Sequence, residues 1–247
     1  MIRATILTAL MDEYDSLKPT CPQEGADVNW VCLTDSKTIR DEAEEHTARL
    51  LDLGAAEVRG LQHPTGWVII YYDRPADEHP NRAAKRPKMH PGMYTNAPAS
   101  VWLDGSFRVV SPRFVVDTVT IAGESEHGIA QFSHPWRDCL YSEVTASLEL
   151  PKYADEAQRI RVQRDAYLAA WMPPGWGLWA TGVIARIHTR PVLDWGMAWA
   201  RQIDAYSYQD QISEPYVLWR AGLRPANLPG DHFNNAWLAY EGSARHG

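Results

Sequence analysis

The sequence has few cysteines, no excess of positive charge and no long hydrophobic run. Its three cysteines, Cys21, Cys32 and Cys139, are odd in number and widely spaced, so they encode neither a disulfide framework nor a Cys-x-x-Cys zinc site. No apolar run approaches the roughly 20 residues of a membrane-spanning helix. The formal net charge of −7 gives no basic surface for duplex nucleic acid, so we expect no such partner.

Short motifs of several enzyme classes are also absent. The sequence contains no Gly-x-Gly-x-x-Gly, P-loop, Gly-x-Ser-x-Gly or His-Glu-x-x-His motif, which excludes most dinucleotide-binding proteins, NTPases, α/β-hydrolases and zincins. Residues 1–8 lack the basic region, the apolar stretch and the cleavage site of a secretory signal. We therefore expect a cytoplasmic protein whose cysteines stay reduced.

What the sequence does contain is an alternation of strand and helix patterns. Apolar segments predict strands over 2–10, 28–33, 67–72, 99–103, 129–132 and 177–185. Amphipathic segments predict helices over 36–53, 138–149, 152–171, 191–206 and 208–220, with a short basic helix or turn over 81–89. This order predicts a single α/β domain with a mostly parallel sheet, whose ligand crevice lies at the carboxyl ends of the strands.

Helical spacing also predicts the buried faces. The helix over 191–206 is expected to bury Leu193, Met197, Ala200 and Ile203. The helix over 152–171 is expected to present one apolar stripe that ends at Trp171. Aromatic faces can stack on sugars, but most of the 11 tryptophans are assigned to the core.

The most informative candidate is an acid at the end of an apolar strand. Residues 101–103 deliver Asp104 to the carboxyl end of a strand, and Gly105 permits a sharp turn before Ser106. A carboxylate beside a hydroxyl is a foothold for Mg²⁺ or Mn²⁺, which bind few protein ligands and complete their shells with diphosphate oxygens. The other interpretation is an ordinary Asp-Gly turn between two strands.

A basic cluster precedes this acid. It consists of Arg82, Lys85, Arg86 and Lys88. Beside the crevice these side chains could neutralise phosphates, with arginine favoured for forked contacts. Alternatively, they form the solvated face of a short helix.

A second group of polar residues follows the predicted strand over 129–132. His134 lies at the end of that strand, where crevice residues collect. Arg137 and Glu143 could hold the hydroxyl groups of a polyol by forked hydrogen bonds. Helix capping or a local ion pair is the alternative role for this segment.

Two further segments have candidate residues. Gly182 lies inside an apolar strand, where glycine indicates a bulge or the close approach of another group, such as a ligand. Arg186 and His188 share one face of the same region, either as ligand contacts or as satisfied polar residues of an edge strand. Asp210 starts a helix, either as a crevice carboxylate or as an acid favoured by the helix dipole.

The order of these segments resembles one known family over about residues 4–220. The matching segments are Thr8-Ala9 with Tyr14-Asp15 and Leu17-Lys18, Cys32-Leu33-Thr34-Asp35, Lys88, Val101-Trp102-Leu103-Asp104-Gly105, His134-Pro135 with Arg137-Asp138-Cys139 and Tyr141-Ser142-Glu143, Gly182-Val183-Ile184 with Arg186 and His188, and Asp210-Gln211-Ile212-Ser213. Together they resemble a glycosyltransferase-like family of bacteria, phages and plants. That family includes plant glycosyltransferase-like proteins related to mucilage and a plant protein described as an alkaline ceramidase.

The resemblance implies a GT-A-type fold, in which a Rossmann-like sheet flanked by helices is joined continuously to an acceptor-binding half. Within a single domain of residues 1–247, residues 1–110 would bind a UDP- or GDP-linked sugar and residues 111–247 the acceptor. By position, the residues implied in nucleotide binding are Thr8, Ala9, Tyr14 and Asp35 for the nucleoside, and Arg82 and Lys88 for the diphosphate. Those implied in contacts with the sugar or the acceptor are Arg137, Glu143, Gly182, Arg186 and His188.

The resemblance also implies an Asp-x-Asp motif that binds Mn²⁺ or Mg²⁺, of which Asp104 is the surviving acid. The sequence reads Asp104-Gly105-Ser106, so the second carboxylate is missing from its usual place. Either His232 supplies a ligand or the dependence on metal is weak.

The implied reaction transfers a sugar from a nucleotide diphosphate to a glycan, a protein or another hydroxyl compound. Asp210 is the candidate base, with Gln211 beside it on the reacting sugar, and His134 is the alternative base. Similar folds whose corresponding helix starts with Asp-Gln often retain the configuration of the sugar, which favours retention here.

Two other functions remain open from the sequence. One is hydrolysis of an amide lipid such as ceramide, against which the chain has no lipid-sized apolar segment. The other is a non-catalytic carbohydrate-binding protein that keeps the fold, which the incomplete metal motif favours.

Overall fold

The computed structural model describes residues 1–55 and 58–242. Within them the chain forms an eight-stranded sheet of order β3-β4-β2-β1-β5-β8-β7-β9. In that order the strands are Leu61–Gln62, Val68–Tyr71, Ala26–Thr34, Ile2–Leu10, Ala99–Leu103, Trp179–Ile187, Ile129–Ser133 and Ala226–Asn227. A separate antiparallel pair is formed by β6 (Phe107–Val109) and β10 (Leu238–Tyr240).

The central strands determine where a ligand can bind. Strands β4, β2, β1 and β5 run parallel, so their carboxyl ends meet at one edge of the sheet. Strand β8 is antiparallel to both of its neighbours, β5 and β7. This large, mostly parallel sheet flanked by helices confirms the predicted α/β class and is consistent with a GT-A-like fold.

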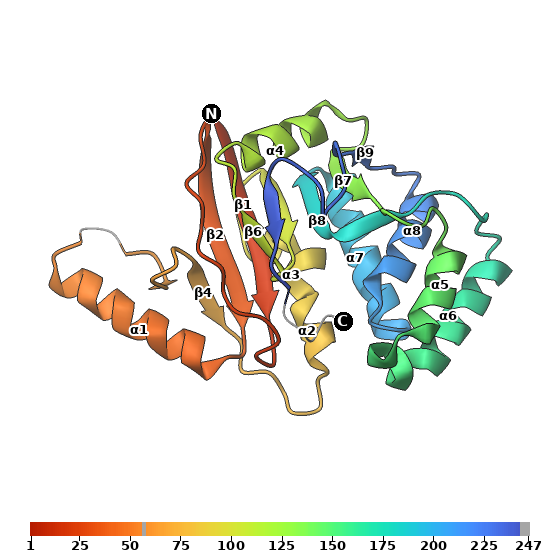
Figure 1. Cartoon of the computed structure of the whole chain (residues 1–247), viewed down its shortest axis with the longest axis horizontal. Coiled ribbons are helices and arrows are strands. Elements are labelled where there is room, and N and C mark those ends of the chain that lie inside the picture. Colours follow the sequence, from red (N-terminus) through yellow and green to blue (C-terminus); the bar gives the residue numbers. More distant parts are fainter. Residues whose placement is uncertain (56–57, 243–247) are drawn as a thin grey trace.

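Helices cover both faces of the sheet. Their bounds are α1 Lys37–Asp52, α2 Pro80–Ala84, α3 Arg86–Met89, α4 Phe114–Glu124, α5 Leu140–Glu149, α6 Ala157–Ala169, α7 Arg190–Ala205 and α8 Asp210–Ala221. Buried residues of α1 and α4 pack with Ala4 and Ile6 of β1, whereas those of α3, α7 and α8 pack with Leu7. Because successive side chains of a strand point to opposite faces, β1 is apolar on both. Figure 1 shows α5, α6, α7 and α8 grouped on one side of the molecule and α1 on the other.

The structure corrects the prediction for the helix over 152–171. Residues Pro151–Glu156 form a 3₁₀ turn, and α6 begins only at Ala157. Trp171 lies beyond the end of α6 with a positive φ of 62° and is 87% exposed, so it is not part of the buried stripe. Ile160 and Tyr167 are buried as the spacing requires. The prediction failed at the helix end because Trp171 adopts a left-handed conformation that spacing alone does not reveal.

The predicted buried face of α7 is also partly wrong. Ile203 is buried, but Met197 is exposed and Leu193 and Ala200 are only half-buried. The core-facing side is instead made by Val192, Trp195 and Trp199, whose two indole rings stack at 5.2 Å. The assignment of these two tryptophans to the core is confirmed. Successive residues of a helix lie about 100° apart around its axis, so a shift of one residue in the pattern changes the face that is buried. In α7 the large surfaces of the tryptophans determine this face.

Helix α4 and the short strands β3, β9 and β10 have no counterpart in the sequence analysis. Helix α4 is rich in β-branched residues, which favour strands, yet it buries Val115, Val119 and Ala122 at helical spacing.

None of the helices in the described ranges combines the length and apolar character that crossing a bilayer demands.

Close packing of α7 against α3 depends on Gly196. A Cβ atom at this position would overlap the carbonyl oxygen of Met89, the residue that follows Lys88. We therefore expect Gly196→Ala to lower the free energy of unfolding by about 1–3 kcal/mol, although alanine is the better helix former. Denaturant unfolding followed by circular dichroism measures the change.

Gly123→Ala is the matched control for this substitution. Gly123 also lies inside a helix, but its Cβ would meet only Ile187 at an ordinary distance of 3.8 Å. We expect this variant to be as stable as the wild type or more stable by up to about 1 kcal/mol. If Gly196→Ala behaved like Gly123→Ala, the close approach of α3 and α7 would be refuted.

Candidate functional site

A cavity of about 620 Å³ opens at the carboxyl edge of the parallel strands. Its walls come from the end of β1, the turn after β5, helices α2 and α3, the start of α8 and the loop before β10. The cavity therefore lies at the edge where the strand order predicts a ligand crevice.

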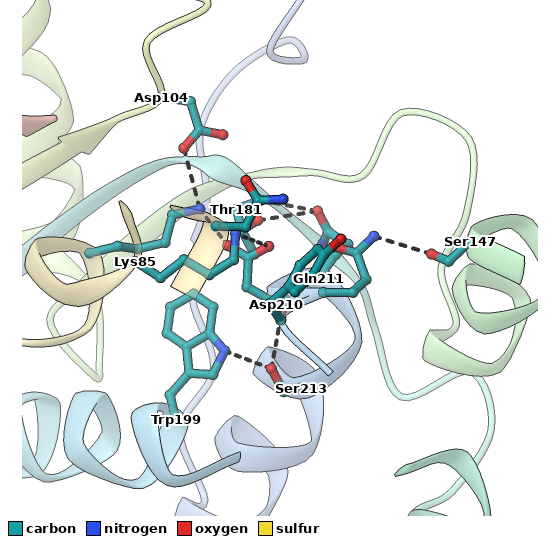
Figure 2. Close-up of polar contacts among 12 residues, drawn as sticks. Lys85, Asp104, Ser147, Thr181, Trp199, Asp210, Gln211 and Ser213 are labelled. Atoms are coloured by element: carbon teal, nitrogen blue, oxygen red, sulfur yellow. Dashed lines mark hydrogen bonds and ion pairs between the residues drawn. The ribbon is translucent and has the colours of Figure 1, made fainter. Parts of the chain in front are cut away.

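Two lysines and two aspartates meet in this cavity. The Nζ atom of Lys88 lies 2.5 Å from Oδ2 of Asp210 and 3.3 Å from Oδ1 of Asp104. The Nζ atom of Lys85 lies 3.3 Å from Oδ1 of Asp210. Figure 2 shows Lys85, Asp104 and Asp210 converging from three separate segments. We refer to Lys85, Lys88, Asp104 and Asp210 as the charged quartet.

Mutual attraction favours the charged forms of two members of the quartet, Asp210 and Lys88. Burial tends to raise the pKa of Asp210, but Lys85 and Lys88 outweigh burial and lower that pKa to about 2. Burial tends to lower the pKa of Lys88, but Asp104 and Asp210 outweigh burial and raise it. At Lys85 burial outweighs Asp210, so the pKa of this amine is lowered. Asp210 is therefore ionised at neutral pH and is a poor proton acceptor.

Lys88 is held in place from the opposite side of α3. Its side chain is only 2% exposed, and its backbone carbonyl accepts a hydrogen bond of 2.5 Å from Arg186 on β8. Arg186 is itself buried and lies over the Trp195 ring. Arg186 therefore fixes the backbone that carries Lys88 and does not line the cavity.

A tight turn after β5 presents Asp104 to the cavity. The indole Nε1 of Trp102 donates to Oδ1 of Asp104 at 2.6 Å, and the backbone of Asp104 accepts from the amide of Phe107. A Cβ at Gly182 would lie 3.2 Å from Oδ2 of Asp104, so the glycine in β8 allows this carboxylate to approach. The turn joins β5 to β6, as one interpretation of this segment predicts, and it also places Asp104 in the wall of the cavity.

The first turn of α8 places Asp210 and Gln211 beside each other. The side chain of Gln211 donates to the carbonyl of Trp179, and its Oε1 accepts from the amide of Thr181 at 3.2 Å. This pair of bonds locks the amide against β8. Gln209, just before the helix, donates to Glu143 at 3.3 Å and to Ser147 at 3.1 Å.

Glu143 lines the cavity, and the residues behind it do not. The Nε atom of Arg137 donates to Glu143 at 2.6 Å, yet burial outweighs this arginine and raises the pKa of the carboxyl group. His134 accepts backbone hydrogen bonds from Trp136 and Arg137, and burial lowers the pKa of its imidazole to about 4. Arg137 and His134 thus hold the segment that supports Glu143.

Several predicted site residues bond to other parts of the protein and do not line the main cavity. Arg82 donates to the carbonyls of Ile203 and Tyr206. Asp35 pairs with Arg74 at 2.6 Å, and the hydroxyl of Thr8 is buried beside a smaller cavity.

His188 bonds Ser100 through its imidazole, with Nε2 lying 2.9 Å from the serine hydroxyl. The predicted site residues that do line the main cavity are Ala9, Tyr14, Lys88, Asp104, Ser106, Glu143, Gly182, Asp210, Gln211 and His232.

His232 supplies the observation that bears on a metal ion. Within the described residues, both ring nitrogens of His232 are buried and have no hydrogen-bond partner. Burial lowers the pKa of this imidazole despite the nearby carboxylates of Asp104 and Asp231, so a neutral ring is available as a ligand. No group of three or more histidine, cysteine or acidic side chains that could hold an ion occurs in residues 1–55 and 58–242. A metal here would need oxygens of a bound substrate to complete its shell, as Mg²⁺ and Mn²⁺ commonly do.

The sequence analysis did not select several residues that line the cavity. Lys85 was recognised only as part of a basic cluster, although it lies three residues before Lys88 and hence about one helical turn away. Gln209 directly precedes Asp210 and Gln211, and this position beside two selected residues was the signal that could have identified it. Phe233 and Tyr240 had no local signal, because only the tertiary fold brings the segment before the C-terminus to this cavity.

The fold and the cavity define an α/β protein with a charged ligand site at the carboxyl edge of its sheet. The family model described as TOD1/MUCI70, glycosyltransferase-like domain matches residues 2–229, so the chain belongs to this family. The resemblance to a glycosyltransferase-like family is thereby confirmed, and it supports a general glycosyltransferase function with a sugar donor and an acceptor as partners. A comparison with curated protein sequences gives no match.

Proposed function

We propose that the protein transfers a sugar from a UDP- or GDP-linked donor to a hydroxyl group of an acceptor. The observation that carries this proposal is the charged quartet at the end of β5. The cavity of about 620 Å³ lies within the range of small-molecule sites. Family membership supports glycosyl transfer in general, and the nucleotide donor is our extension of it.

The cavity offers separate positions for the parts of such a donor. Ala9, near the end of β1, and Tyr14, just after that strand, are assigned to the nucleoside. Lys85 is assigned to the diphosphate, because a buried amine whose pKa is lowered gains most from an anionic ligand. Lys88 donates hydrogen bonds and lies between the carboxylates of Asp104 and Asp210, which accept them. This alternation suits neighbouring hydroxyl groups of the transferred sugar, since each hydroxyl can both donate and accept.

The residues present also fit a divalent metal. Asp104 and His232 would hold Mn²⁺ or Mg²⁺ together with diphosphate oxygens, and the Ser106 hydroxyl lies in the same wall. When bound, the ion stabilises the negative charge on the departing diphosphate.

Transfer forms a bond between the acceptor oxygen and the anomeric carbon and breaks the bond from that carbon to the diphosphate. The diphosphate leaves with the electron pair, and Lys85 stabilises its charge. Asp210, with a pKa of about 2, stabilises positive charge at the anomeric carbon and does not take the proton. The proton of the acceptor passes to the departing phosphate oxygen, which favours retention of configuration.

Hydrolysis of a ceramide-like amide is less well supported by this site. The cavity brings ammonium and carboxylate groups together at its centre, and a nucleotide sugar matches them whereas the alkyl chains of a lipid do not. A non-catalytic carbohydrate-binding protein would not require a buried quartet of this kind, and the donor titration separates it from a transferase.

Isothermal titration calorimetry with UDP and GDP tests the proposed donor. We expect one of them to bind and Mn²⁺ to tighten binding by about tenfold or more. His232→Ala should abolish the effect of Mn²⁺ and change metal-free binding by less than about twofold, because it removes a metal ligand and no phosphate contact.

His46→Ala is the matched control, since His46 lies on α1 and does not line the cavity. Its titrations should equal those of the wild type with and without Mn²⁺. Absence of binding for both nucleotides under both conditions would refute the nucleotide donor. Tight metal-dependent binding that survives His232→Ala would remove His232 from the metal site.

A further inference from the structure

Three aromatic side chains form a continuous surface at the mouth of the cavity. Trp136 follows β7, Phe233 lies in the loop before β10, and Tyr240 ends β10. The ring centroids of Trp136 and Phe233 are 5.5 Å apart, and those of Phe233 and Tyr240 are 5.1 Å apart. We refer to Trp136, Phe233 and Tyr240 as the aromatic rim.

The rim is exposed to solvent, unlike most large aromatic residues of the chain. Trp136, Phe233 and Tyr240 are 68%, 43% and 44% exposed. Single exposed apolar residues are common, but three that are linked through contacts with the central Phe233 form a patch of the kind that marks a binding surface. Phe233 and Tyr240 also line the main cavity, so the patch is continuous with the charged site.

Local structure fixes the position of the rim. The carboxylate of Asp231 accepts from the amides of Phe233 and Asn234 at 2.8 and 2.9 Å, which closes a tight loop. Gly230 enters this loop with a φ of 82°, and a Cβ there would overlap the carbonyl oxygen of Asn234. Strand β10 is held by antiparallel pairing with β6, beside which it runs in Figure 1. The exposed rings of Phe233 and Tyr240 are therefore held by backbone hydrogen bonds and are pre-organised for a ligand.

The rim also lies next to the proposed reaction centre. The Phe233 ring packs edge-on against the His232 ring at 4.0 Å, and His232 faces the cavity that contains Asp104. A ligand on the rim can therefore extend directly into the cavity, because Phe233 and Tyr240 belong to both.

We propose that the aromatic rim is the acceptor subsite and that the acceptor is a saccharide of at least two residues. A pyranose ring has an apolar C–H face, which packs on an aromatic ring, and a hydroxyl edge, which suits a charged cavity. One residue stacks on Trp136 and Phe233, and the next enters the cavity with its hydroxyl group toward the anomeric carbon. An alkyl chain on the rim would have to continue toward the charged quartet, where it would exclude water from ionised groups and offer them no hydrogen bonds.

The acceptor role rests on the proposed function, whereas the binding of saccharide to the rim does not. Saturation-transfer difference NMR measures that binding with tetrasaccharides of glucose, xylose, mannose, galactose and N-acetylglucosamine. We expect at least one to bind, and Trp136→Ala and Phe233→Ala each to weaken its binding by about tenfold or more. Calorimetry with UDP and GDP on Trp136→Ala, whose side chain does not line the cavity, should give the wild-type affinities.

Trp171→Ala is the matched control, because Trp171 is 87% exposed and does not line the cavity. Its saccharide binding should equal that of the wild type. The proposal is overturned if no tetrasaccharide binds, or if binding is the same in both rim variants and the wild type. It is also overturned if phosphatidylcholine vesicles or an unfolded polypeptide such as casein bind through Trp136 and the saccharides do not. If the wild type bound neither UDP nor GDP, the proposed donor site would be refuted, but the binding of saccharide to the rim would not.

Discussion

Asp210→Asn is expected to lower kcat by about 1000-fold or more and to change the affinity for the donor by less than about tenfold. The asparagine keeps the shape of the side chain but removes a negative charge that is present at all physiological pH values, since the pKa of Asp210 is about 2. That charge acts mainly when positive charge develops on the sugar, which happens in the transition state. Steady-state kinetics with saturating acceptor measure the effect.

Asp210 is also part of a buried ion pair, so the experiment needs a measure of folding. Removing one partner of such a pair costs about 3–5 kcal/mol, because Lys85 and Lys88 lose their shared carboxylate. Calorimetric titration with nucleotide gives the fraction of competent protein, to which kcat is then normalised. Asp204→Asn, an exposed position on α7, should match the wild type. An increase in KM at unchanged kcat would assign Asp210 to donor binding and not to the chemical step.

Lys88→Met is expected to weaken donor binding by about 100-fold or more and to change how stability depends on pH. The folded-state pKa of Asp210, about 2, lies below its ordinary value of 3.8, so this group stabilises the fold above about pH 4 and the contribution is lost as the pH falls toward 2. The shift corresponds to about 2 kcal/mol. Without Lys88, only Lys85 opposes the effect of burial, so the pKa of Asp210 is lowered less and part of this contribution disappears.

The difference in unfolding free energy between the wild type and Lys88→Met should therefore be largest near pH 7 and shrink toward pH 2. Urea unfolding at pH values from 2 to 7 measures it. Lys37→Met, at the exposed start of α1, is the matched control and should show the wild-type profile. A difference that stays constant over this pH range would mean that Lys88 contributes through packing and not through its pairing with Asp210.

Much of the fold was predictable because burial on two faces leaves a clear pattern. Strands β1, β2 and β5 appear in the sequence as short apolar runs, and α1 begins after the predicted cap at Ser36, whose hydroxyl accepts from the amide of Ile39. Helix α4 was not predicted, since its β-branched residues favour a strand locally and only packing against β8 and the neighbouring strands makes the helix stable.

Two acids of the site were predictable from a position just after a strand or at the start of a helix, although His134 and Asp35 also follow strands and do not line the cavity. Asp104 and Asp210 have such positions, and both lie in the cavity. Arg82, Arg186 and His188 looked equally suitable from their residue types, yet the structure uses them to bond backbone carbonyls and a serine within the protein. Residue type shows what a side chain can bind, and only the neighbouring elements determine what it does bind.

The sequence by itself determined the α/β class, the crevice at the carboxyl ends of the strands and the identity of Asp104 and Asp210 as candidate acids. These features depend on local periodicity and on strand ends, which neighbouring residues specify. Tertiary structure decided which cations meet those acids and which aromatic rings border them. Lys88 and Asp210 are 122 positions apart in the chain, and Trp136 and Phe233 are nearly 100 positions apart. Only the packing of distant segments brings the members of each pair together.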